Sequence, residues 1–89
     1  MNSLSWRDKY KLALKEALTI KEIMLLRGCG QPKATKIREE SIQYCLKNNI
    51  ETEFRRVSTL AVFAITGLNL DYYYEKMLQE QRINICAEV

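Results

Sequence analysis

The sequence predicts a mainly α-helical protein of four to five short helices that contain a helix-turn-helix, and three observations support this fold class. Apolar residues recur three and four positions apart along most of the chain, which is the spacing of one helix face. Residue types that cap helices precede these segments, and glycine or asparagine follows them. No repeat or linker rich in proline and glycine interrupts the 89 residues, so we expect a single domain over residues 1–89.

The first helix is expected to begin after Ser5, a residue type common at helix N-termini. Its apolar face consists of residues three or four positions apart, which are Trp6, Tyr10, Ala13, Leu14 and Ala17. Arg7, Lys11 and Lys15 fall on another side of the helix, so the segment is expected to be amphipathic.

The helix-turn-helix is predicted within a core of about residues 18–68, and its first helix is short. Thr19 and Glu22 have the spacing of a capping box, and apolar residues continue from there to Gly28. Gly28 and Gly30 can both adopt the positive φ that ends a helix and turns the chain. We therefore expect the first helix to stop at Gly28.

The second helix of the pair is expected to open near Pro32, because proline suits the first turn of a helix, where no N–H is needed. Asn48-Asn49 closes it. Its small or apolar stripe consists of Ala34, Ile37, Ser41, Ile42 and Cys45. This stripe is expected to seat against the first helix of the pair.

The segment between Ile50 and Val57 is too short and too charged for a helix, and it predicts either a small β-ribbon, which would be a wing, or a loop. Ser58 or Thr59 is expected to cap the next helix, which ends at Gly67. That helix is apolar on most sides and is expected at the centre of the core, with Leu60, Ala61, Phe63, Ala64, Ile65 and Leu68.

A last helix is predicted over about residues 70–82, capped by Asn69 or Asp71. The apolar residues on one of its faces are Leu70, Tyr73, Tyr74, Met77 and Leu78. We expect this face to support a homodimer or to bind another protein. The apolar pattern fades after Arg82, so the remaining residues are expected to fray.

The composition argues against several functional classes. Hydrophobic residues make up 47% of the chain, which argues against disorder, yet no apolar run reaches the roughly 20 residues of a membrane span. The first residues lack the charged start and apolar centre of a signal peptide, so a cytoplasmic location is expected. Histidine is absent, and Cys29, Cys45 and Cys86 are widely spaced. We therefore expect no metal site, no cofactor and no catalytic residues, and hence no enzyme.

Basic residues are concentrated in the first two thirds of the chain. The formal net charge of +3 is made up of +2 over residues 1–20, +3 over residues 21–56 and −2 over residues 57–89. In the middle segment, the second helix of the pair presents polar side chains in its first turns, namely Gln31, Lys33, Thr35, Lys36 and Glu39. A recognition helix in the major groove needs such a polar N-terminal half and an apolar reverse side. Double-stranded DNA is therefore the expected partner.

The polar residues of this helix have expected roles at a DNA surface. Lys33 and Lys36 add charge to the free backbone N–H groups at the helix N-terminus, which can hold a phosphate. Gln31 and Thr35 are expected to read base edges. Arg38 lies at the border of the apolar stripe, where it either contacts a phosphate or pairs with an acidic side chain.

Arg55 and Arg56 follow the segment that is expected to be extended and precede a capped helix, as in the basic arm of a wing that touches DNA. Neighbouring side chains of an extended chain point to opposite faces, so one of the two arginines is expected to face the nucleic acid. The order of TIKEIMLLRG, QPKATKIREESIQYCLKNN and FRRVSTLAVFAITGL resembles the winged helix-turn-helix of small excisionases and of MerR-type DNA-binding domains. The resemblance covers about residues 18–68.

This resemblance implies a protein of a phage or mobile element that binds DNA and bends or marks it. It implies a transcription regulator or an excisionase-type recombination directionality factor that acts beside a recombinase. The roles that it carries over fall on Lys33, Thr35, Lys36, Arg55 and Arg56. The chain departs from the family pattern in two places, since it lacks a glycine near the tip of the wing and has an extra helix at its N-terminal end.

An alternative interpretation is a small helical protein-protein interaction module or inhibitor that binds no nucleic acid. Helix pairs joined by glycine-containing turns are common in helical proteins. The acidic residues near the predicted DNA surface would also repel phosphates if they faced it, and these are Glu39, Glu40, Glu51 and Glu53. Salt-dependent retention on nonspecific DNA distinguishes the two interpretations.

Overall fold

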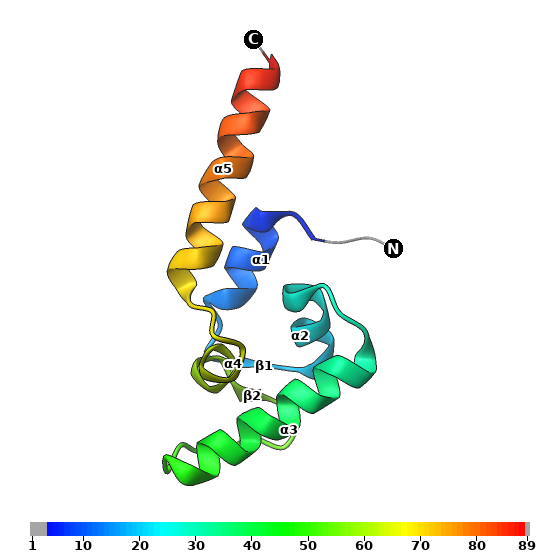
Figure 1. Cartoon of the computed structure of the whole chain (residues 1–89), viewed down its shortest axis with the longest axis vertical. Coiled ribbons are helices and arrows are strands. Elements are labelled where there is room, and N and C mark those ends of the chain that lie inside the picture. Colours follow the sequence, from blue (N-terminus) through cyan, green and yellow to red (C-terminus); the bar gives the residue numbers. More distant parts are fainter. Residues whose placement is uncertain (1–3, 89) are drawn as a thin grey trace.

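A computed structural model describes residues 4–88, and it describes side-chain surroundings for residues 4–82. Within that range the protein is mainly helical, as predicted, with one small antiparallel sheet. The elements in chain order are α1 (Trp6–Ala13), β1 (Ala17–Leu18), α2 (Ile20–Arg27), α3 (Gln31–Lys47), β2 (Val57–Ser58), α4 (Thr59–Thr66) and α5 (Leu70–Glu88). Figure 1 shows α1 and α5 side by side at one end, with α2, α3, α4 and the strands at the other.

Helix α1 begins where the sequence predicts but ends earlier. Its N-cap is Ser5, whose side-chain Oγ accepts a hydrogen bond from the N–H of Asp8 at 3.2 Å. The prediction that the helix face extends to Ala17 is wrong, because α1 ends at Ala13 and Ala17 lies in β1. Two backbone carbonyls after the end of α1 accept hydrogen bonds from Thr59. The hydroxyl of Thr59 donates to the carbonyl of Lys15, and its N–H donates to the carbonyl of Glu16. These bonds draw the chain away from α1 towards α4.

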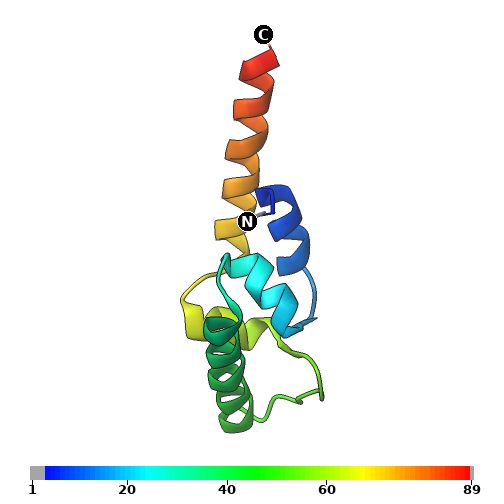
Figure 2. The same ribbon diagram turned by 90° about the vertical axis from the view of Figure 1, so that its right-hand side faces the viewer.

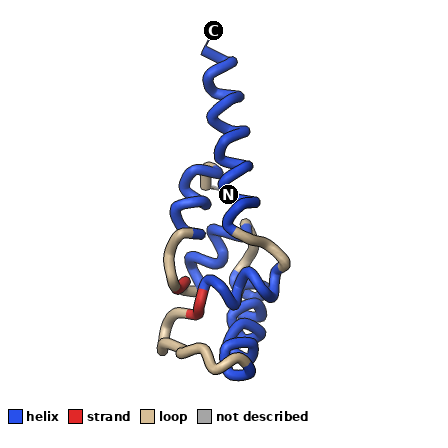
Figure 3. Tube along the Cα trace, turned by 90° about the vertical axis from the view of Figure 1, so that its left-hand side faces the viewer, coloured by secondary structure: helices blue, strands red, loops and turns tan. Residues whose placement is uncertain are grey.

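The sheet joins the segments before α2 and before α4. Its strands are antiparallel, with Ala17 opposite Ser58 and Leu18 opposite Val57. A ribbon within residues 50–57 was one of the two sequence predictions, but residues 50–56 form an irregular loop, drawn in tan in Figure 3, and only Val57 enters a strand. A tight hairpin needs a residue suited to positive φ at its turn, and this loop has no glycine or asparagine between residues 50 and 56.

The helix-turn-helix geometry follows the predicted caps closely. Thr19 and Glu22 form a reciprocal capping box, and α2 ends at Gly28 with a left-handed φ of 62°. Gly30, by contrast, has a φ of −80° and serves as the N-cap of α3, so the expectation of a positive φ holds at only one of the two glycines. Helix α3 opens with Pro32 in its first turn and ends at its C-cap Asn48.

The core lies between α3 and the other elements. The predicted stripe of α3 is buried at Ala34, Ile37, Ser41 and Cys45, while Ile42 is half-buried. The other fully buried residues are Ala13, Leu18, Ile23, Leu26, Val57, Thr59, Ala61, Val62 and Tyr73. Helix α4 was expected at the centre, but it is buried on one side only, and Leu60 remains 65% exposed. The reason is that α4 packs on α3 and both strands through one face, and no described element covers the opposite face.

Helix α5 is longer than predicted, running to Glu88 with no glycine or proline to interrupt it. Its first turns pack on α1 through aromatic rings: Tyr72 and Tyr73 lie 6.0 and 6.2 Å from Trp6, and Tyr74 lies 5.5 Å from Tyr10, measured between ring centroids. Beyond these turns the helix projects past the end of α1 (Figure 1). No helix within residues 4–88 is both long enough and apolar enough to cross a membrane.

Candidate nucleic-acid interface

Helix α3 presents most of its predicted DNA-binding residues to solvent. Gln31, Lys33 and Lys36 are exposed, and Thr35 is half-buried. Successive helical residues are about 100° apart, so Lys36 faces almost directly away from the buried stripe, whereas Lys33 lies on one flank of it. The helix therefore carries a polar outer face opposite the face that packs on α2.

The N-terminus of α3 offers backbone donors beside these side chains. Its N-cap, Gly30, has no side-chain oxygen to accept the amide hydrogens of the first turn. Gln31 and Lys33 have backbone N–H groups in this turn, whereas Pro32 has none. Free amides at a helix N-terminus favour an anion, and the side chain of Lys33 adds positive charge beside them.

Arg38 lies on the opposite flank of the buried stripe from Lys33, and it holds the loop that follows α3. Its Nη2 donates a hydrogen bond to the backbone carbonyl of Phe54 at 3.1 Å. The expected contact of Arg38 with a phosphate stays a prediction, and no ion pair of Arg38 with an acidic side chain is found among the described residues. This hydrogen bond fixes the position of the loop relative to α3. Figure 2 shows the loop bulging outward between α3 and α4.

The loop and the N-terminus of α2 enclose a hollow with three cations on its walls. This hollow, of about 450 Å³, is lined by Thr19, Ile20, Lys21, Arg38, Phe54 and Arg55. The structure thus brings together Arg38 and Arg55, which the sequence analysis selected separately, and adds Lys21. Neither glutamate of the loop lines the hollow. The surface of the hollow is mainly apolar, and the three basic residues that line it can supply positive charge to a phosphate backbone beside it.

Arg55 and Arg56 are both exposed in the loop. The expectation that an extended chain sends them to opposite faces does not apply directly, since Arg55 lies at a bend and not in a strand. The guanidinium carbon of Arg55 lies 6.0 Å from the ring centroid of Phe54. Arg55 is therefore the member of the pair that the structure places beside the hollow.

Acidic side chains reduce the positive charge of this candidate DNA surface. Glu39 is exposed on the outer face of α3 near Lys36, and Glu51 and Glu53 are exposed in the loop. They lower the local positive potential and would repel phosphates that approached them closely. A carboxylate on a recognition helix can also accept a hydrogen bond from the N4 amino group of cytosine. The surface is thus of mixed charge, with its least acidic part around the hollow.

The capping box that positions this hollow contains an ion pair. Glu22 accepts hydrogen bonds from the N–H of Thr19 and from the ammonium of Lys15. Partial burial raises the pKa of Glu22, but the bonds and the charge of Lys15 and the bonds from Thr19 outweigh burial and hold the pKa below its ordinary value of 4.5. The start of α2 is therefore stabilised by a carboxylate that stays ionised at neutral pH.

One residue of the predicted partner face of α5 is buried within the chain. Tyr73 is 1% exposed and stacks on Phe63 at 6.0 Å between ring centroids, so it belongs to the core and is not available to a partner. Burial raises its pKa, against the opposing effect of Arg27 nearby. Tyr74 packs on Tyr10 but stays exposed, Leu70 lines an open pocket, and Met77 and Leu78 are half-buried.

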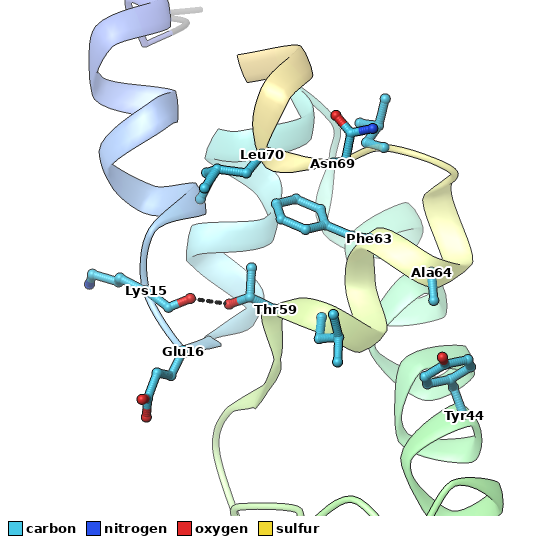
Figure 4. Close-up of a pocket in the computed structure, with 11 residues that line it drawn as sticks. Lys15, Glu16, Tyr44, Thr59, Phe63, Ala64, Asn69 and Leu70 are labelled. Carbon is cyan, nitrogen blue, oxygen red and sulfur yellow. Dashed lines mark hydrogen bonds between the residues drawn. The ribbon is translucent and has the colours of Figure 1, made fainter. Parts of the chain in front are cut away.

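A larger pocket lies on the side of α4 that the core leaves uncovered. It has a volume of about 670 Å³, and Figure 4 shows its lining, which comes from α4, the end of α1, the start of α5 and Tyr44 of α3. Most of the lining is apolar, including Leu60, Phe63 and Leu70. The sequence does not predict this pocket, because the apolar residues of α4 have the pattern of a central core helix.

Lys21 and Phe54 line the hollow but were not among the site residues predicted from the sequence. Lys21 is the second residue after the predicted cap Thr19, so its place in the first turn of a helix was available as a signal. Phe54 was grouped with its charged neighbours in a segment predicted as ribbon or loop. No family model, curated protein or solved structure matches the chain, so the resemblance to winged helix-turn-helix proteins stays a hypothesis.

Proposed function

We propose that this protein binds double-stranded DNA, with the N-terminal half of α3 in the major groove and the loop of residues 50–56 on the adjacent backbone. The observation that carries the proposal is that Lys21, Arg38 and Arg55 line one hollow on the flank of α3, a helix whose outer face is polar and exposed. These three residues come from three separate segments, namely the start of α2, α3 and the loop. This arrangement fits a phosphate next to a groove occupied by the helix.

The residues divide into positioning and reading roles. Lys33, Lys36, Lys21 and Arg55 contact phosphates in this proposal, because they are positively charged and exposed on this side of the molecule. Gln31 and Thr35 lie in the first turns of α3 and read base edges. Arg38 acts mainly through the loop that it holds.

Binding to a labelled duplex, measured by fluorescence anisotropy over a series of salt concentrations, tests the proposal. The logarithm of the association constant should fall linearly with the logarithm of salt concentration, with a slope of about −0.9 for each phosphate neutralised. The double substitution Lys33→Glu with Lys36→Glu should abolish binding without unfolding the protein, because both side chains are exposed. Unchanged affinity of the folded double variant would refute the assignment of α3.

A matched control separates local contact from overall charge. Lys11→Glu with Arg82→Glu makes the same change in net charge on exposed residues of α1 and α5, away from α3. This control should lose affinity only through the long-range field, which salt screens within about 10 Å at 0.1 M. Equal losses in the two double variants would show that binding follows net charge and not the α3 surface.

The biological setting that we propose follows the family resemblance. A phage or mobile-element regulator and an excisionase-type factor both bind sites near the genes that they control. Sequencing of genomic fragments retained by the protein tests this setting, and enrichment of fragments from its own genomic neighbourhood is the expected result. Copurification of a recombinase with the bound fragments would favour the excisionase role.

One observation favours a second candidate function, a protein-protein interaction module. The pocket beside α4 is open and mainly apolar, and Leu60 at its edge is 65% exposed, so together they form the kind of contiguous apolar surface that marks protein-binding sites. A protein that shows no salt-dependent DNA binding but loses a partner on Leu60→Asp would have this function. The two functions are compatible, since the pocket and the hollow are lined by different residues.

A further inference from the structure

The most exposed large apolar side chain among the described residues is Phe54, at 88%. The next are Leu60 and Leu46, at 65% and 62%. Phe54 lies in a loop in which residues 51–56 are all exposed, so it stands on a protrusion and not at the edge of the core. A phenylalanine left in water forgoes the stabilisation that burial would bring, and its ring is free to contact a partner.

Arg38 contacts the backbone of Phe54, and Arg55 lies near its ring. Its carbonyl accepts the hydrogen bond from Arg38 of α3 at 3.1 Å, and the guanidinium of Arg55 lies 6.0 Å from its ring. Phe54 also lines the basic hollow together with Lys21. An exposed ring thus lies close to Arg55 and shares a hollow with Lys21 and Arg38, on the flank of the helix proposed to enter the major groove.

We propose that Phe54 is a wedge that inserts between base pairs from the minor groove and bends the DNA at that step. This inference rests on the proposed function. Proteins that contact the minor groove commonly insert apolar side chains between stacked bases, with basic residues holding the flanking phosphates. Arg55 and Lys21 lie where they can supply that charge, and Arg38 resists displacement of the loop by the stacked bases.

The wedge also predicts a sequence preference that needs no hydrogen bond to a base. Pyrimidine-purine steps such as TA unstack most easily, whereas A-tracts are stiff. Duplexes with a TA step beneath the loop should therefore bind more tightly than duplexes with an A-tract there. The preference should depend on Phe54 and not on the lysines of α3.

The test is a bend measurement on the whole protein with end-labelled duplexes that carry one central TA step or an A-tract. Energy transfer between the end labels reports the bend, and anisotropy on the same duplexes reports affinity. The wild-type protein should bend the TA duplex within the range of about 20–90° seen for such wedges. Phe54→Ala should remove most of the bend and the TA preference, with a loss of affinity below about tenfold.

Two further variants define the role of the ring. Phe54→Leu keeps an apolar side chain of wedge size and should keep most of the bend. Leu60→Ala removes an exposed apolar side chain from α4, outside the hollow, and should bend DNA like the wild type. An unchanged bend in Phe54→Ala, or salt-dependent binding to DNA that stays straight, would overturn the wedge while leaving the proposed function intact. Absence of duplex binding by the wild type would overturn both.

Discussion

The side chain of Glu80 caps the N-terminus of α1 from 74 residues away along the chain. Its Oε2 accepts a hydrogen bond from the N–H of Trp6 at 3.1 Å, and its Oε1 accepts one from Arg7 at 3.4 Å. A carboxylate at this place satisfies free amides and is favoured by the helix dipole. The pair therefore joins the two helices that flank the helix-turn-helix, and it orients α5 along α1.

Glu80→Ala should lower the free energy of unfolding by about 1 kcal/mol, which is the usual effect of removing a helix cap. Chemical denaturation followed by circular dichroism measures the change. Glu75→Ala serves as the control, because Glu75 is exposed on the same helix and makes none of the described hydrogen bonds to α1. An equal loss in the two variants would contradict the capping role.

The two glycines of the turn should respond oppositely to a side chain. Gly28 has a left-handed φ of 62°, so Gly28→Ala should cost about 1 kcal/mol of stability through backbone strain alone, since no atom lies within 4 Å of the added Cβ. Gly30 has a φ of −80° and is the N-cap of α3, so Gly30→Ser supplies a capping oxygen and should stabilise the protein by a few tenths of a kcal/mol. Thermal melting of the two variants checks the sign of each effect.

The ion pair of Glu22 gives the stability a specific dependence on pH. The pKa of Glu22 in the folded protein lies below its value of 4.5 in the unfolded chain, so its contribution is fully present above that pH. The contribution is lost as the pH falls below 4.5 through the folded pKa. Glu22→Gln keeps an acceptor for the Thr19 N–H but no charge. It should be less stable than the wild type at pH 7, and the difference should shrink in acid.

Denaturation curves at a series of pH values from neutral to acidic test this expectation. Comparison of the wild type with Glu22→Gln cancels the titration of the other carboxylates, which both proteins share. A difference in unfolding free energy that stays constant below pH 4.5 would show that the charge of Glu22 does not stabilise the capping box.

Arg38→Ala should free the loop without unfolding the protein. The substitution removes the hydrogen bond to the carbonyl of Phe54, a contact at the surface with a net contribution of about 1 kcal/mol. Trypsin should then cleave faster after Arg55 and Arg56 at temperatures where the protein stays folded, and the melting temperature should fall by about 4–8 °C. Lys36→Ala on the same helix is the matched control, and equal cleavage rates in the two variants would argue against Arg38 as the anchor of the loop.

Much of the fold was predictable from local residue patterns. The capping box at Thr19, the left-handed Gly28 and the stripe from Ala34 to Cys45 depend on neighbours within a few residues, and the structure confirms each of them. The polar face of α3 follows from the same periodicity. The end of α1 was not predictable, because it is set by Thr59, which lies 44 residues from Lys15 in the chain.

The remaining differences also come from contacts between distant segments. The two-residue strand β1 has no local signal and exists because Val57 and Ser58 pair with it. Tyr73 has the same helical spacing as a partner-binding residue, and only the packing of Phe63 and α1 shows that it is buried. The hollow is likewise formed by three segments that are distant in the sequence. Local patterns could therefore not predict that Lys21 and Phe54 belong to the candidate site.

The projection of α5 has a practical consequence for single-molecule work. The molecule is 51 Å long on its longest axis, and Figure 1 places α3 at one end and the tip of α5 at the other. A biotin or a fluorophore attached near Glu88 would therefore stand far from the polar face of α3. The protein can be immobilised through that end with its opposite end free in solution.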